Sequence, residues 1–174
     1  MSGGRPAVFF DRDGVLNLDE AGYTYRVEDL VWTPGAMAAV RAVNDAGWAA
    51  VVVTNQSGVA RGYYDEAAVA AFHARMQAEL AEAGARIDAF HACFHHPEAA
   101  EARWRHPDHP DRKPNPGMLL RAAAELGLDL PRSVLIGDRQ SDLEAARRAG
   151  VRSVLYTGGD LRPVVLAALD AART

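Results

Sequence analysis

The sequence has very little cysteine and no long apolar run. Cys93 is its single cysteine, so no internal disulfide can form and a reducing compartment is expected. No apolar run approaches the length that crosses a bilayer, and the segment from Met1 to Pro6 lacks the apolar stretch of a signal peptide. These features predict a cytoplasmic protein without a membrane partner.

Excess positive charge is also missing. Lysine and arginine number 19 against 23 aspartates and glutamates, which gives a formal net charge of −4 at pH 7. Surfaces that bind nucleic acids are usually basic, so no nucleic-acid partner is expected. Hydrophobic residues make up 49% of the chain, as in packed globular proteins. With 174 residues, we expect a single domain over residues 1–174, present as a monomer.

Strand-like and helix-like segments alternate along the chain. The expected strands are the apolar runs at residues 7–10, 48–53, 89–94, 133–136 and 153–156. The expected helices lie at residues 34–46, 65–83, 116–127, 141–150 and 163–172, with Asp65 and Ser141 as N-caps. This alternation predicts an α/β fold, a Rossmann-like three-layer sandwich around a central, mainly parallel sheet. The stretch from His95 to Asn115 exceeds the usual connection length, which indicates a functional loop.

Polar side chains follow three of the predicted strands, at the point where each strand ends. They are Asp11 and Asp13 after the first strand, Thr54 and Asn55 after the second, and Asp138 after the fourth. The carboxyl ends of parallel strands meet at one edge of a sheet, where α/β proteins bind their ligands. Two adjacent carboxylates favour a cation between them, so these residues indicate a Mg²⁺ site beside groups that bind phosphate. We expect Asp11 and Asp13 to face one ligand only if the chain stays extended until Gly14.

Four ordered motifs resemble the haloacid dehalogenase superfamily of phosphatases. They are Asp11-Arg12-Asp13-Gly14, Thr54-Asn55-Gln56-Ser57-Gly58, Arg112-Lys113-Pro114, and Gly137-Asp138 with Asp142. The longer stretches at residues 53–62 and 112–118 resemble the heptose-bisphosphate phosphatases and the related histidinol-phosphatases. The resemblance covers residues 6–159, and the intervals between the motifs leave no room for a lid domain. It therefore implies a capless member of the superfamily with an open site.

The resemblance also implies covalent catalysis. Asp11 is the expected nucleophile and forms an aspartyl-phosphate. Asp13 is expected to protonate the leaving oxygen and then to deprotonate the water that cleaves the intermediate. The implied Mg²⁺ ligands are Asp11, the backbone carbonyl of Asp13, and Asp138.

Further residues are implied to bind the phosphate groups of the substrate. Thr54 and Asn55 contact the phosphoryl oxygens, and Lys113 pairs with both the nucleophile and the phosphate. Arg61 and Arg112 lie where a second anionic group could be held, because a guanidinium binds phosphate through two hydrogen bonds. Either arginine could instead be a solvated surface residue.

The implied activity is a Mg²⁺-dependent phosphoric monoester hydrolase. Its implied substrate is a small-molecule sugar bisphosphate, D-glycero-D-manno-heptose 1,7-bisphosphate, from which it removes the 7-phosphate. The alternative is histidinol phosphate or another small sugar phosphate. Arginines favour a bisphosphate, whereas Asp19, Glu20 and Glu28 would favour the amine of histidinol phosphate. A non-catalytic binding module is a third hypothesis, but every catalytic position is filled.

One loop departs from the family pattern. Cys93-Phe94-His95-His96-Pro97 resembles the first half of a structural zinc loop, whose second half is normally a Cys-x-Cys pair directly before Arg-Lys-Pro. This chain has His109-Pro110-Asp111 there instead. Cys93, His95 and His109 are the predicted zinc ligands, with His106 or Asp111 as the fourth. A loop that has lost its zinc is the alternative. His73 and His91 are expected to be structural or surface residues.

Overall fold

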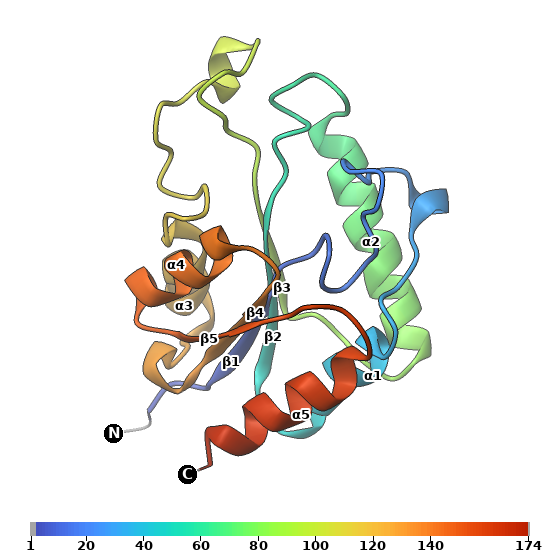
Figure 1. Cartoon of the computed structure of the whole chain (residues 1–174), viewed down its shortest axis with the longest axis vertical. Coiled ribbons are helices and arrows are strands. Elements are labelled where there is room, and N and C mark those ends of the chain that lie inside the picture. Colours follow the sequence, from blue (N-terminus) through green and yellow to red (C-terminus); the bar gives the residue numbers. More distant parts are fainter. Residues whose placement is uncertain (1–2, 174) are drawn as a thin grey trace.

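The computed structural model describes residues 3–173, and its centre is one sheet of five strands (Figure 1). The strand order is β3-β2-β1-β4-β5, and each neighbouring pair runs parallel. The strands are β1 (Ala7–Phe10), β2 (Ala49–Asn55), β3 (Ala89–Cys93), β4 (Val134–Gly137) and β5 (Arg152–Leu155). The α-helices are α1 (Ala36–Asp45), α2 (Glu66–Glu82), α3 (Gly117–Leu126), α4 (Gln140–Ala149) and α5 (Leu161–Ala171). Short 3₁₀ helices are η1 (Val27–Asp29), η2 (Ala102–Trp104) and η3 (Leu130–Arg132).

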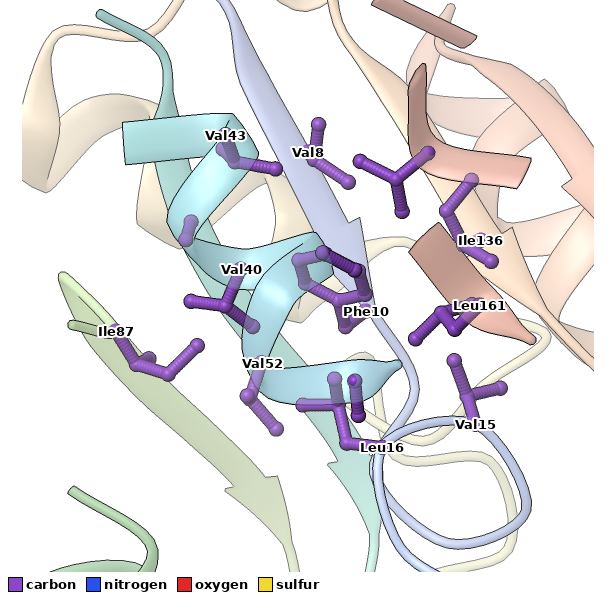
Figure 2. Close-up of a cluster of buried hydrophobic side chains, with 14 of the residues drawn as sticks. Val8, Phe10, Val15, Leu16, Val40, Val43, Val52, Ile87, Ile136 and Leu161 are labelled. Atoms are coloured by element: carbon purple, nitrogen blue, oxygen red, sulfur yellow. The ribbon is translucent and has the colours of Figure 1, made fainter. Parts of the chain in front are cut away.

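Helices cover both faces of the sheet, because successive strand residues point to opposite sides. Phe10 belongs to a buried cluster with residues of α1, α2 and α5, and Phe9 belongs to a second cluster with residues of α3 and α4. Figure 2 shows Phe10 in the first cluster together with Val40 of α1 and Leu161 of α5. The predicted three-layer α/β architecture is confirmed.

Some boundaries differ from the sequence prediction for identifiable reasons. The second strand continues past Val53, since Thr54 and Asn55 still pair with β3. The predicted cap at Ser141 is wrong, because the N-cap is Arg139, two residues earlier, and α4 begins at Gln140. The Asp142 carboxylate accepts hydrogen bonds from the backbone N–H groups of the two preceding loop residues at 3.2 and 3.1 Å, which starts the helix before Ser141.

The topology places the site at the middle of the sheet. The chain adds β2 and β3 on one side of β1 and then crosses to add β4 and β5 on the other side. Ligands of open α/β sheets bind beyond the carboxyl ends of the strands where the connections diverge in this way. Within residues 3–173, the segments between the strands form no lid domain, and none of their helices has the length and apolar character to cross a membrane.

A fully buried arginine lies two residues after the end of β1. Both the Nε of Arg12, at 2.9 Å, and its Nη2, at 2.7 Å, contact Oδ1 of Asp13, and its Nη2 also donates to the Thr24 carbonyl at 2.6 Å. Its Nη1 lies 3.3 Å from Nε2 of His73, and its guanidinium lies 4.3 Å from the centre of the Phe72 ring. Since a guanidinium can only donate, Nε2 of His73 must be the unprotonated nitrogen. His73 is therefore a buried, neutral acceptor for Arg12.

This histidine makes stability depend on pH. Burial, followed by the positive charge of Arg12, lowers the pKa of His73 from 6.5 to about 3. The unfolded chain protonates His73 near its ordinary pKa, whereas the folded chain keeps His73 neutral. The contribution of neutral His73 to the free energy of unfolding is therefore complete above about pH 6.5 and is lost as the pH falls. We predict that the free energy of unfolding falls by up to about 1.4 kcal/mol per pH unit below that value.

The matched variant is His73→Gln, whose amide oxygen can still accept from Arg12. Urea unfolding between about pH 7 and pH 5 should give this variant a shallower decrease than the wild type. Parallel pH dependences for the two proteins would contradict the neutral state of His73.

Candidate active site

A buried lysine joins the ends of three elements. Lys113, which is 4% exposed, donates from Nζ to Oδ1 of Asp11 at 3.0 Å, to Oδ1 of Asp142 at 2.5 Å and to the Val53 carbonyl at 2.9 Å. Burial lowers the pKa of Lys113, but the charges of Asp11 and Asp142 outweigh it, and the net shift is upward. Lys113 is therefore a fixed positive charge beside Asp11.

Asn55 holds the backbone of this lysine. Its Oδ1 accepts from the Lys113 N–H at 3.0 Å, and its Nδ2 donates to the Lys113 carbonyl at 3.1 Å. Asn55 lies in the pocket wall as the sequence predicts, but both polar atoms of its side chain are used by Lys113. The end of β2 thus positions the segment of the loop that carries Lys113.

Three carboxylates lie close together beside this lysine, two of which it contacts. One oxygen from each of Asp11, Asp138 and Asp142 lies within 4.8 Å of the others. Burial and the neighbouring carboxylates together outweigh the positive charge of Lys113 and hold the pKa of Asp11 well above its ordinary value. Asp138 can lie this close to the chain after β1 because residue 14 is a glycine. A Cβ at Gly14 would lie only 2.3 Å from Oδ2 of Asp138. The cluster is more negative than one lysine can balance.

These carboxylates are not equally free to bind a cation. Both oxygens of Asp142 are used, one by Lys113 and the other by the backbone at the start of α4. Oδ1 of Asp138 is buried and makes no hydrogen bond to any of residues 3–173. An unpaired buried carboxylate oxygen is costly unless a cation occupies its side. The donor set of Asp11 and Asp138 therefore fits a hard divalent cation such as Mg²⁺.

The second aspartate of the first motif is held by several donors. Oδ1 of Asp13 accepts from Arg12 and, at 3.0 Å, from Nδ2 of Asn17, and its Oδ2 accepts from Nε2 of Gln56 at 3.0 Å. The condition that the chain stay extended until Gly14 is wrong, because the Arg12 carbonyl already accepts N–H groups from the following turn and Asp11 and Asp13 nevertheless line the same pocket.

The pocket has a volume of about 250 Å³. Its wall includes six of the predicted residues, namely Asp11, Asp13, Thr54, Asn55, Arg112 and Lys113. Arg61 is exposed and does not belong to this wall. Arg139, which follows Asp138, does belong to it. The structure thus brings one of the two predicted arginines to the pocket and adds another.

Sequence reasoning expected the loop from Gln56 to Tyr64 to take part in substrate recognition but gave neither residue a role of its own. Both line the pocket, and the Tyr64 hydroxyl donates to Oε1 of Gln56 at 2.7 Å. The spacing of Thr54 and Gln56 was a usable signal, because residues two apart at a strand end point to the same side. Tyr64 lies in a loop, where no periodicity predicts direction.

The second cluster lies on the loop between β3 and α3, which extends away from the sheet in Figure 1. Ligand atoms of Cys93, His95 and His109 lie within 4.8 Å of one another. The rings of His95 and His109 stack with their centres 3.8 Å apart, and Trp104 packs edge-on against His95. Burial raises the pKa of the Cys93 thiol. One thiol and two imidazoles are donors that zinc accepts.

Neither candidate for a fourth ligand joins this set among the described residues. The carboxylate of Asp111 is paired with Arg121. The ring of His106 lies with its centre 5.1 Å from that of His109, and its Nδ1 accepts from a backbone N–H at 3.0 Å. The ring of His106 is thus less committed than the carboxylate of Asp111.

Comparisons with known proteins identify close relatives of this chain. The HAD-hydrolase-like family model matches residues 111–174. A D-glycero-D-manno-heptose-1,7-bisphosphate 7-phosphatase from Thermosynechococcus vestitus is 49% identical over 89% of this chain and 80% of its own length. A D-glycero-beta-D-manno-heptose-1,7-bisphosphate 7-phosphatase from Mesorhizobium japonicum is 46% identical over 89% of this chain and 70% of its own.

Solved structures agree with these sequence relatives. A HAD-like phosphatase from Mesorhizobium loti superimposes with a TM-score of 0.86 at 38% identity, covering 98% of this chain and 88% of the other. The D,D-heptose 1,7-bisphosphate phosphatase of B. bronchiseptica, complexed with magnesium and phosphate, has a TM-score of 0.78 at 31% identity. That match covers 97% of this chain and 96% of the other.

Proposed function

The chain belongs to the D-glycero-D-manno-heptose-1,7-bisphosphate 7-phosphatase family of haloacid dehalogenase-like hydrolases, and we propose that it removes the 7-phosphate of that sugar bisphosphate. It is a phosphoric monoester hydrolase. The observation that carries the assignment is the contact of buried Lys113 with Asp11, beside the unpaired oxygen of Asp138. A nucleophile, a fixed positive charge and a place for a cation are the parts that phosphoryl transfer needs.

Asp11 attacks phosphorus and carries the phosphoryl group. Its Oδ1 accepts from Nζ of Lys113 at 3.0 Å and from the backbone N–H of Arg12 at 2.9 Å, and these two donors fix the carboxylate plane. Asp13 gives a proton to the leaving sugar oxygen as the ester bond breaks. It then takes a proton from the water that cleaves the aspartyl-phosphate.

Mg²⁺ would be held by Asp11, Asp138 and the backbone carbonyl of Asp13. When bound, it neutralises negative charge on the phosphoryl group and on the carboxylate that approaches it. Asp142 is assigned to Lys113 rather than to the metal, since both of its oxygens already have partners.

The remaining pocket residues suit a substrate with two phosphates. Thr54 and Lys113 contact the transferred phosphoryl group. Arg112 and Arg139 lie in the wall, and within residues 3–173 neither guanidinium makes an ion pair, so both are available to the second phosphate. Arg61 is exposed outside the wall and receives no role in this assignment.

One observation favours a second candidate substrate. Asp19 lies in the pocket wall, and a carboxylate there would suit the amine of histidinol phosphate. Asp19 is already used in part, because its Oδ1 accepts from the N–H of Thr24 at 3.1 Å and from its hydroxyl at 2.6 Å. The two arginines therefore outweigh it.

The substrate assignment predicts a ranking. With Mg²⁺ present, kcat/KM should be at least about tenfold higher for one anomer of D-glycero-D-manno-heptose 1,7-bisphosphate than for histidinol phosphate, since hydrogen bonds to a charged group contribute about 1.5–3 kcal/mol. The measurement is phosphate release from both anomers and from histidinol phosphate, side by side. Comparable low values for all three would contradict the assignment.

The setting follows from features of the whole chain. We assign the enzyme to the cytoplasm, as a monomeric single domain over residues 1–174 without nucleic-acid or membrane partners. The acidic net charge of −4 and the single, buried cysteine support this setting. Met1, Ser2 and Thr174 lie outside the described residues.

Zinc would be held by Cys93, His95 and His109, with His106 as the fourth ligand in place of Asp111. Its role is structural, because it would pin the long loop that ends at Lys113. We predict close to one equivalent of zinc in protein purified without a histidine tag. Less than about a tenth of an equivalent by metal analysis would mean that packing of Trp104 alone holds this loop.

A further inference from the structure

Gln56 lies between Asp13 and Thr54, two polar residues to which the proposed phosphatase mechanism gives a role. It is 1% exposed, and its Nε2 lies 3.0 Å from Oδ2 of Asp13 and 2.8 Å from Oγ1 of Thr54. Its Oε1 lies 2.7 Å from the hydroxyl of Tyr64. The side chain therefore uses all of its polar atoms inside the pocket wall.

The direction of each hydrogen bond follows from chemistry. An amide nitrogen has two protons, so Gln56 donates one to the carboxylate of Asp13 and one to the oxygen of Thr54. Since the Thr54 oxygen already accepts, its own proton remains for another acceptor, and a phosphoryl oxygen is the acceptor that the substrate supplies. Gln56 thus orients two groups, the Thr54 hydroxyl as a hydrogen-bond donor to the phosphate and the carboxylate of Asp13.

Tyr64 decides which way the amide of Gln56 points. An amide oxygen can only accept, so the Tyr64 hydroxyl must donate to it. Burial is the main cause that raises the pKa of Tyr64, which keeps the hydroxyl protonated. The Tyr64 ring stacks on Tyr25 with centres 4.8 Å apart, and a Cβ at Gly58 would lie 2.2 Å from the ring. The stacking on Tyr25 and the close approach of Gly58 therefore hold the donor in place.

Without this donor, the amide could turn over. A turned amide would place Oε1 of Gln56 against Oδ2 of Asp13, so that two acceptors would face each other. Asp13 would then be held only through Oδ1, by Arg12 and Asn17, and Oδ2 would lose its donor and be repelled from its present position. A general acid works only within hydrogen-bond reach of the oxygen that it protonates.

We propose that Gln56, fixed by Tyr64, is a positioning residue that orients Asp13 for proton transfer to the leaving oxygen. The inference rests on the proposed phosphatase function. The step is the usual ester cleavage: a bond forms between an Asp11 carboxylate oxygen and phosphorus, the phosphorus–oxygen bond to the sugar breaks, and the Asp13 proton goes to that sugar oxygen. Gln56 and Tyr64 take no proton themselves.

The test compares leaving groups. Nitrophenolate leaves without a proton, whereas a sugar alkoxide needs one, and kcat/KM reports the step in which it leaves. In Gln56→Met and Tyr64→Phe, kcat/KM for heptose 1,7-bisphosphate should fall about 10- to 100-fold. For p-nitrophenyl phosphate, the fall should be at least about fivefold smaller. Tyr63→Phe is the matched control, because Tyr63 is exposed and its hydroxyl makes no hydrogen bond within residues 3–173.

Equal losses on both substrates, or wild-type values on both, would overturn the positioning role. Thermal unfolding of each variant separates misfolding from mispositioning, and Tyr64→Phe changes a single hydroxyl if Gln56→Met is poorly folded. A wild-type enzyme that fails to hydrolyse heptose 1,7-bisphosphate would instead contradict the proposed function. The two failures are therefore distinguishable.

Discussion

The buried ammonium group of Lys113 is the interaction on which the site depends. It joins Asp11 after β1, the Val53 carbonyl of β2 and Asp142 of α4 within hydrogen-bond distance. Removing one partner of such a buried ionic pair typically costs about 3–5 kcal/mol, because the other charge is left unpaired. The contacts of Lys113 that hold the end of β1, β2 and the start of α4 together also place a positive charge beside the proposed nucleophile, Asp11.

The sheet topology makes this meeting possible. β1 lies between β2 and β4, so the residues that follow these strands converge at one edge. Asn55 at the end of β2 then holds the backbone of Lys113 by two hydrogen bonds, and Asp142 at the start of α4 pairs with the ammonium group of the same lysine. The site is thus built from strand ends, a helix start and the end of the long loop beyond β3, which carries Lys113.

Much of the site could be predicted from the sequence because strand ends are readable. Apolar runs placed Asp11, Thr54 and Asp138 at strand ends, and parallel pairing brought them together. The hydrogen-bond partners of Arg12 and Gln56 were not readable, so the roles of these two residues emerged only from their contacts. The exposure of Arg61, the start of α4 and the missing fourth zinc ligand depend on loop packing, which no periodicity encodes.

The central claim is that Asp11 is a covalent nucleophile held by Lys113. The most direct measurement is turnover of heptose 1,7-bisphosphate by Asp11→Asn with Mg²⁺ present, on protein whose thermal unfolding shows that it is folded. The amide retains the shape of the carboxylate but is a far weaker nucleophile, so the account predicts no detectable phosphate release. Turnover near the wild-type rate would contradict it.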